Sequence, residues 1–415
     1  MRVADNHRHV VLLWIQFKVP SQEMVFSMVL FIFALGCDPD IKGSLSNDTG
    51  QTIEDSGVDT GTDSGVESAQ LPLLVVEAAS GAISASLSLH SLEDWSAMNM
   101  VDAVSPDSRL VHSGGYVWLL ERGSQERISK YDPSDIFQTP LRYDLTPGEA
   151  GFPSDVSFCG DRVFVTLYDG TELLVLDPED LTEETRLDIS QYADGDGLPE
   201  ASSMVCKEGT LIVSLHRENR NEVEGASTPQ QIGSLWLFYD SATLELEKLK
   251  EDIGYRGQIY DIAGTDYLGV SIHSHIDVSG TTGFWTYGIQ EDAFHSQIYS
   301  AFNDMAINST AFDTVNAVHI AKSWYDDSSM AFCHPLTPGA SLPNNMLPVS
   351  APVDSHYHHV FMDDQGRAWI AFERHLNEGL ELEYGIFPVD PIRCELHSDE
   401  IITEKRVVSA VYLWD

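Results

Sequence analysis

From Leu71 onward, short apolar runs alternate with polar turns, and no long stretch repeats its hydrophobic positions with the period of a helix. The runs are rich in β-branched and aromatic residues and are bounded by Gly, Asp, Asn and Pro. This pattern is typical of strands joined by tight turns. We therefore predict an all-β domain over residues 71–415.

The β-rich part of the chain is built from a loose internal repeat. Each unit has an apolar strand, a polar turn, a strongly β-forming strand, a polar loop and a third strand. Copies start at Arg109, Asp155 and Ser203, and later ones cover 259–292, 305–335 and 357–391. A repeat of about 40 to 60 residues with this content is typical of a β-propeller blade. The units predict a single β-propeller of seven blades, closed by pairing residues 73–91 with 407–415; a β-sandwich is the alternative.

The N-terminal region is predicted to be an export signal. Its apolar run, Met24–Gly36, is shorter than the ~20 residues that span a bilayer. It ends in Ala34-Leu35-Gly36-Cys37, which resembles the lipobox of bacterial lipoproteins. The resemblance implies cleavage after residue 36 and a diacylglycerol on the Cys37 thiol. The alternatives are a plain signal peptide or an uncleaved anchor, and Met24 or Met28 can be the start.

Residues 37–70 are predicted to be a disordered acidic tether. They contain almost no large apolar side chains and repeat Asp-Thr/Ser-Gly from Asp48, Asp55, Asp59 and Asp63. Such a segment buries too little surface to offset its ordering entropy. The repeat units themselves resemble YVTN-type propellers, and residues 191–200 resemble a segment of propeller lipoproteins. The resemblance implies an exported protein, lipid-anchored in the cell envelope, and implies no particular activity.

The formal net charge is −42, from 65 acidic and 23 basic residues. A surface of this charge repels phosphate backbones, and no cluster of Lys and Arg offsets the repulsion. We therefore exclude nucleic acid as a partner and expect a cation, a neutral small-molecule ligand or a basic protein whose identity the sequence does not give. High net charge also keeps an exported domain soluble, and we expect a monomer.

Besides Cys37, the chain has four cysteines, an even number that suggests two disulfides in an exported protein. Cys159 and Cys206 close the first strand of consecutive repeat units, so we predict that they pair. Cys333 and Cys394 lie in the outer halves of the last two units and are expected to pair in the same way. Free buried thiols are the alternative.

In a propeller, the loops after the second strand of each blade emerge on one face, where a binding site would lie. Polar residues in and beside these loops are the predicted channel-mouth ligands: Arg122, His216, Arg217, His273, His275, Lys322, His356, His358, Glu373 and Arg374. The histidines are also candidate ligands of a transition metal. A solvated rim is the alternative interpretation.

Asp194, Asp196 and Glu200 resemble a short calcium loop, although a plain turn would also explain them. No nucleophile elbow, P-loop or dinucleotide motif is present in the sequence. We therefore expect a non-catalytic scaffold that binds a ligand or a protein. The alternative is an envelope hydrolase, lyase or metal-dependent oxidoreductase that uses the channel-mouth residues.

Overall fold

The computed structural model describes residues 12–17, 26–31, 72–79, 82–123, 126–145, 151–219, 230–231, 233–251, 255–273, 283–299, 305–313, 315–323, 328–340, 347–349, 355–376, 381–396 and 400–413. Two compact units divide the chain between Ser64 and Gly65. In the first unit, β1 (Leu12–Phe17) pairs antiparallel with β2 (Phe26–Phe31). Among the described residues, none belongs to a helix of the length and apolarity needed to cross a membrane.

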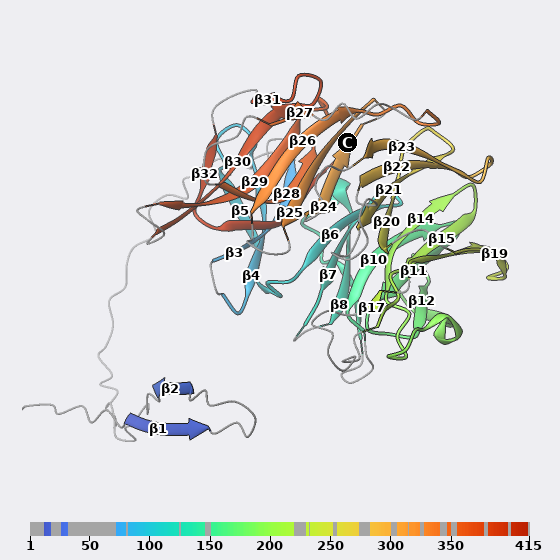
Figure 1. The fold of residues 1–415 in the computed structure, drawn as a ribbon, viewed down its shortest axis with the longest axis horizontal. Helices are drawn as coiled ribbons and strands as arrows, with labels where there is room; N and C mark the ends of the chain where they lie inside the picture. Colours follow the sequence, from blue (N-terminus) through green and yellow to red (C-terminus); the bar gives the residue numbers. More distant parts are fainter. Residues whose placement is uncertain are drawn as a thin grey trace, which may run out of the picture. The chain divides into compact units, whose positions relative to one another are not determined.

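The second unit is a seven-bladed β-propeller, as predicted, whose blades follow one another in chain order (Figure 1). From the inner to the outer edge, the first four blades contain β33 (Arg406–Tyr412), β3 (Leu73–Ala78), β4 (Ala85–His90) and β5 (Ala97–Val104) in blade 1; β6 (Arg109–Ser113), β7 (Tyr116–Glu121), β8 (Arg127–Tyr131) and β9 (Leu141–Asp144) in blade 2; β10 (Pro153–Cys159), β11 (Arg162–Leu167), β12 (Glu172–Leu176) and β13 (Glu183–Asp188) in blade 3; and β14 (Ala201–Lys207), β15 (Thr210–Leu215), β18 (Leu235–Asp240) and β19 (Leu246–Lys250) in blade 4.

The remaining blades contain β20 (Tyr255–Asp261), β21 (Tyr267–His273), β22 (Gly283–Gly288) and β23 (Ala293–Tyr299) in blade 5; β24 (Met305–Phe312), β25 (Asn316–Ser323), β26 (Ser329–Pro335) and β27 (Leu347–Pro348) in blade 6; and β28 (Ser355–Met362), β29 (Ala368–Leu376), β30 (Glu381–Asp390), β31 (Glu395–Leu396) and β32 (Ile401–Thr403) in blade 7. A two-stranded hairpin of β16 (Glu218–Asn219) and β17 (Gln230–Gln231) and two 3₁₀ turns, η2 (Pro133–Asp135) and η3 (Ser190–Tyr192), complete the described elements.

The ring closes through blade 1, which takes its innermost strand from the C-terminal end of the chain. β33 pairs antiparallel with β3, with Leu73 opposite Tyr412 and Ala78 opposite Arg406. This pairing confirms the predicted closure. It also removes the open strand edges that blades 1 and 7 would otherwise expose.

The hydrophobic core is divided among the interfaces between blades. In the described part of the chain, each of the seven neighbouring pairs of blades shares one cluster of buried apolar side chains. Trp236 of blade 4, for example, packs edge-on against Tyr287 of blade 5. Both faces of most strands are therefore buried, which explains why the strands are near-continuous apolar runs.

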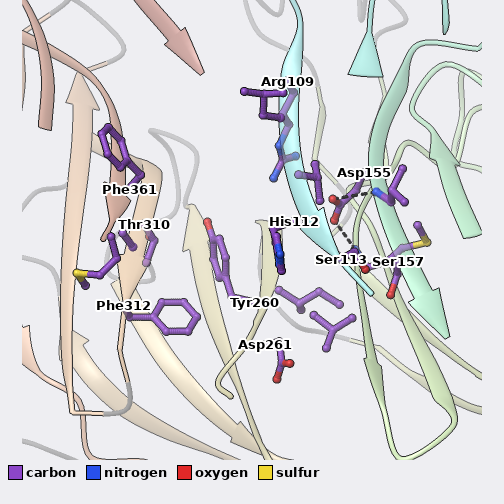
Figure 2. Close-up of a pocket in the computed structure, with 18 of the residues that line it drawn as sticks. Arg109, His112, Ser113, Asp155, Ser157, Tyr260, Asp261, Thr310, Phe312 and Phe361 are labelled. Atoms are coloured by element: carbon purple, nitrogen blue, oxygen red, sulfur yellow. Dashed lines mark hydrogen bonds between the residues drawn. The ribbon is translucent and has the colours of Figure 1, made fainter. Parts of the chain in front are cut away.

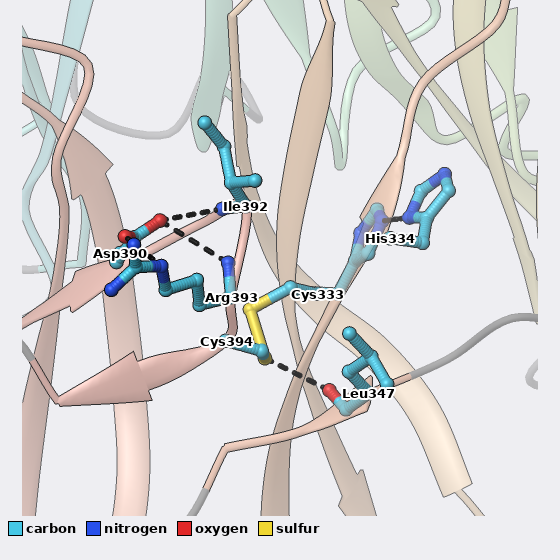
Figure 3. The surroundings of a disulfide bond; sticks show 8 residues. Cys333, His334, Leu347, Asp390, Ile392, Arg393 and Cys394 are labelled. Carbon is cyan, nitrogen blue, oxygen red and sulfur yellow. Dashed lines mark hydrogen bonds and ion pairs between the residues drawn. A yellow bond between two sulfur atoms is a disulfide. The ribbon is translucent and has the colours of Figure 1, made fainter.

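Both predicted disulfides are present, and each links neighbouring blades. Cys159 and Cys206 join the inner strands β10 and β14, with their Cα atoms 5.4 Å apart. Cys333 of β26 and Cys394, in the turn after β30, join blades 6 and 7 (Figure 3). Stable disulfides are typical of oxidising compartments outside the cytosol.

One position recurs in the innermost strand of every blade, at the same register against the neighbouring strand. In six of the blades it directly follows a β-bulge. A bulge bends the strand and re-aims the next side chain. We call these seven residues the clasp ring: Arg109, Asp155, Ser203, Gln258, Ser309, His359 and Ser409.

Six members of the clasp ring bond to the main chain of the next blade. The hydroxyls of Ser409, Ser203 and Ser309 accept the N–H groups of Leu110, Ile259 and Val360 at 3.0, 3.0 and 3.1 Å. The Asp155 carboxylate accepts the Met204 N–H at 2.8 Å. Arg109 and His359 instead donate to the carbonyls of Ser154 and Ala410, at 2.9 and 3.1 Å. Gln258 accepts the Tyr260 hydroxyl of its own blade.

We expect Ser409→Ala to lower the free energy of unfolding by about 1–3 kcal/mol, because the buried Leu110 N–H loses its acceptor. Urea unfolding measures the change. Ser84→Ala, at an exposed position, is the matched control and should stay within about 0.5 kcal/mol of the wild type. Equal stability of the two variants would show that the clasp ring does not hold blades together.

Candidate functional site

A cavity of about 580 Å³ lies at the centre of the ring, lined by the innermost strand of every blade. Its apolar part includes Phe312 and Phe361. Its polar part includes four side chains that carry the chemistry of the site: Arg109, Asp155, Tyr260 and His359. Figure 2 shows Arg109 and Asp155 near one another and Tyr260 projecting into the space between the strands. A concave, partly apolar space with a few polar groups is the usual form of a small-molecule site.

Asp155 is a buried carboxylate held by main-chain donors. Its two oxygens accept the N–H groups of Val156 at 3.0 Å and Met204 at 2.8 Å, and the residue is 6% exposed. Burial raises the pKa of Asp155, while Arg109 and these two N–H groups oppose the rise. The carboxylate is thus committed to joining blades 3 and 4.

Arg109 brings a cation to the cavity wall. One of its terminal nitrogens, Nη1, donates to the Ser154 carbonyl at 2.9 Å. Within the part of the chain that the structure describes, no carboxylate forms an ion pair with Arg109 at 4.0 Å or less. A guanidinium has five N–H donors, so the Ser154 carbonyl occupies only part of its bonding capacity.

His359 and Tyr260 are uncharged polar groups on the same wall. Burial, with a smaller effect from the positive charge of Arg109, lowers the pKa of His359 to about 4, although the hydrogen bond to Ala410 opposes the change. The imidazole is therefore neutral at pH 7, and the Ala410 carbonyl fixes the tautomer with the proton on Nε2. Burial raises the pKa of Tyr260, so its hydroxyl stays protonated and donates to Gln258 at 2.8 Å.

Of the predicted channel-mouth residues whose side chains the structure describes, none is among the residues that line this cavity. Arg122 is engaged with Asp107, donating to its carboxylate at 2.6 Å and its carbonyl at 2.9 Å. His216 lies edge-on to Tyr168, and Arg217 follows it with a positive φ of 54°. Their part in ligand binding stays a prediction.

On blade 7, the predicted residues contact each other or neighbouring side chains. His358 Nε2 lies 3.6 Å from the Glu373 carboxylate and lowers its pKa. Arg374 donates to both oxygens of Glu400, at 2.8 and 3.1 Å. The ring of His356 lies edge-on to that of His375, with centroids 5.5 Å apart.

Lys322 lies half-buried near the end of β25. His273 ends β21, but its side chain and the whole of His275 lie outside the described residues.

The predicted calcium loop is a pair of tight turns. Asp194 Oδ1 accepts the Asp196 N–H at 3.0 Å, and Asp196 Oδ1 accepts the Leu198 N–H at 2.9 Å. Glu200 is fully buried. Considering only residues with described positions, no three His, Cys, Asp or Glu side chains come together in a way that could hold a metal ion. Calcium binding gains no support from this geometry and stays a prediction.

Arg109, Asp155, Tyr260 and His359 were not predicted as site residues. A signal existed, since Arg109 and Asp155 open two of the repeat units as charged residues in otherwise apolar strands. At most positions of the clasp ring, the preceding bulge makes it impossible to infer from the sequence which way the side chain faces. It breaks the alternation from which the facing of a strand residue is inferred.

No protein-family model matches the chain, and no curated protein matches its sequence. Among solved structures, it is similar to a candidate 6-phosphogluconolactonase of Bacteroides uniformis (12% identity, 82% of this chain and 99% of that one, TM-score 0.52). A second candidate 6-phosphogluconolactonase, from Bacteroides fragilis, gives 11% identity, 83% and 98% coverage and a TM-score of 0.51. The β-propeller domain of Cps50 (Swd1) from Myceliophteria thermophila is 11% identical; the match covers 74% of this chain and 92% of that one, with a TM-score of 0.50. At these identities the likeness shows the fold, and the chain is a seven-bladed β-propeller protein.

We expect His359 to make the protein sensitive to acid. Its pKa is about 4 when folded and about 6.5 when unfolded, so between these values the unfolded state binds more protons. The free energy of unfolding therefore has its full value above about pH 6.5 and decreases as the pH falls. At pH 5 the protonation of His359 in the unfolded state lowers it by about 2 kcal/mol. His359→Gln keeps a donor for the Ala410 carbonyl but cannot titrate.

Urea unfolding at pH 7.5 and pH 5.0 should therefore show a smaller drop for His359→Gln than for the wild type. The matched control is His375→Gln, at an exposed position, which should keep the wild-type drop. An unchanged drop in His359→Gln would show that this imidazole is not buried in its neutral form.

Proposed function

We propose that this protein is an exported propeller, lipid-anchored through Cys37, that binds a small polar ligand in its central cavity without transforming it. Residues 1–36 would be the signal peptide and residues 37–70 the tether that holds the propeller away from the membrane. The observation that carries the binding proposal is the wall of a cavity of about 580 Å³, which includes the cation of Arg109, the carboxylate of Asp155 and the neutral hydrogen-bonding groups of Tyr260 and His359.

Two features favour binding over catalysis. Two of the ionisable groups that line the cavity bond to the main chain: Asp155 accepts two N–H groups, and His359 donates to the Ala410 carbonyl. These contacts give both groups a structural role, and Nδ1 of His359 is the one ring nitrogen that keeps a lone pair for proton transfer. The envelope enzyme remains the alternative, and turnover of a cavity ligand would favour it.

Export is supported by the two disulfides, because such bonds persist in oxidising compartments. Lipid anchoring rests on the resemblance of residues 34–37 to a lipobox, and Cys37 lies outside the described residues.

The anchor is tested in a bacterial host that carries lipoprotein-processing enzymes. We expect the wild-type chain to incorporate labelled palmitate and to partition into a detergent phase. Cys37→Ser should lose both properties, because the thiol that carries the lipid is gone. Ser44→Ala, a similar change in the tether, should keep both, and a wild-type chain without label would refute the anchor.

The cavity is tested by thermal shift against a panel of monosaccharides, sugar acids, amino acids and dicarboxylates. We expect at least one member to raise the Tm, since a ligand that binds only the folded state stabilises it. Ala311→Trp and Val111→Trp place an indole in the cavity and should abolish the shift. Ala242→Trp, at an exposed position, should keep it. A shift that survives both cavity variants would place the ligand elsewhere.

A further inference from the structure

Some members of the clasp ring have larger and more polar side chains than are needed to join neighbouring blades. Three of its members are serines, and Ser203, Ser309 and Ser409 each join two blades with a single hydroxyl. Arg109, Asp155 and His359 occupy equivalent positions with larger ionisable groups. All three line the central cavity. Because a serine is enough to join two blades, we expect a larger side chain with unused hydrogen-bonding groups, as Arg109 has, to contact the contents of the cavity.

Among these three, the guanidinium of Arg109 keeps the most unused hydrogen-bonding capacity, although the nearby Asp155 carboxylate partly offsets its charge. The other carboxylate of the lining, Asp261, pairs with Lys207. Asp155 has its two oxygens occupied by main-chain N–H groups, and His359 is neutral. Arg109 is the one Arg or Lys among the described residues that line the cavity. Other arginines of this acidic protein do pair with carboxylates at 4.0 Å or less, namely Arg122, Arg127, Arg162, Arg186, Arg367, Arg374 and Arg393.

From the unused donors of Arg109 we infer that the ligand of the central cavity is a hydroxylated monocarboxylate of sugar-acid size, bound through its carboxylate to the guanidinium of Arg109. The inference rests on the proposed function and specifies its ligand. A guanidinium and a carboxylate form two parallel hydrogen bonds, which fix orientation as well as affinity. A phosphate dianion would call for a second cation, which the described lining does not provide.

The rest of the wall fits the body of such a ligand. The Tyr260 hydroxyl donates to Gln258 and that of Thr310 bonds to His319, so each keeps capacity for one further hydrogen bond to a hydroxylated ligand. Phe312 and Phe361 offer apolar surface to its carbon side. A cavity of about 580 Å³ is within the range that holds small molecules, roughly 300–1,000 Å³.

The net charge of −42 repels an anion at long range, but it does not rule out the ligand. At physiological ionic strength, exposed charges are screened beyond about 8 Å. Arg109 would contact the carboxylate directly, in a cavity where screening is weaker.

The experiment compares three sugar acids with neutral counterparts of similar size: glucuronate, galacturonate and gluconate against glucose, galactose and sorbitol. Calorimetry on the full folded chain should show at least one acid binding roughly tenfold or more tightly than its neutral counterpart. Arg109→Gln should weaken the binding of that acid by a similar factor and leave the affinity for the neutral compound unchanged. Arg109→Lys keeps the positive charge but loses the paired N–H donors of the guanidinium. Its affinity for the acid should lie between those of the wild type and Arg109→Gln.

Arg393→Gln removes an equal charge from an exposed position and should bind like the wild type. Circular dichroism and the Tm without ligand check that the Arg109 variants fold, and the acid-to-neutral ratio of the wild type tests the inference without any variant. Equal binding of acids and neutral compounds, or binding that survives Arg109→Gln, would overturn it.

The failure of this inference is distinguishable from failure of the proposed function. If neutral compounds stabilise the wild type and Ala311→Trp abolishes their effect, the cavity is the site and only the ligand class is wrong. If no member of either panel binds, both the cavity site and the carboxylate ligand are rejected.

Discussion

The innermost strand of a propeller blade has one edge without a partner strand, and this constraint governs the centre of the molecule. Its N–H and C=O groups face the axis, where a buried donor or acceptor without a partner costs about 1–3 kcal/mol. The clasp ring solves the problem with side chains in place of a further strand, as when Ser203 accepts the Ile259 N–H across the blade interface. The same bonds fix the register of neighbouring blades at six of the seven interfaces. Apolar clusters between the blades supply the bulk of the burial but are not directional.

The gap in the clasp ring lies between blades 5 and 6, where Gln258 is held by Tyr260 of its own blade. At this interface aromatic packing joins the blades in place of a hydrogen bond from the clasp ring: the ring of Tyr260 lies edge-on to Phe312, with centroids 6.0 Å apart. Further out, a buried pair of imidazoles within blade 6, His319 and His334, lies at the same interface, with nitrogens 3.1 Å apart. Burial lowers the pKa of His334 to about 3, so the pair stays neutral and packs beside Phe284 of blade 5.

The fold was predictable because repetition makes weak local signals add up. Each unit alone could be a hairpin of any β protein, but units that open in the same way at Arg109, Asp155 and Ser203 point to one repeated sheet. The pairing of Cys159 with Cys206 followed from their equivalent places in consecutive units. The cavity wall was not predicted, because a strand that contains a bulge no longer alternates between two faces. Which neighbour Asp155 or His359 meets depends on the placement of that bulge, and the sequence carries no clear mark of it.

The clasp ring also explains how a rigid repeat fold acquires a specific site at low structural cost. A serine at the clasp position meets the needs of the fold, so a longer polar side chain that keeps one bond to the next blade leaves its other groups for a second task. Arg109 does this by using Nη1 for the Ser154 carbonyl. A ligand held by the remaining donors would therefore engage the side chain that joins blades 2 and 3. Binding there would restrict the movement of those blades against each other, so ligand affinity and ring stability are expected to be thermodynamically linked.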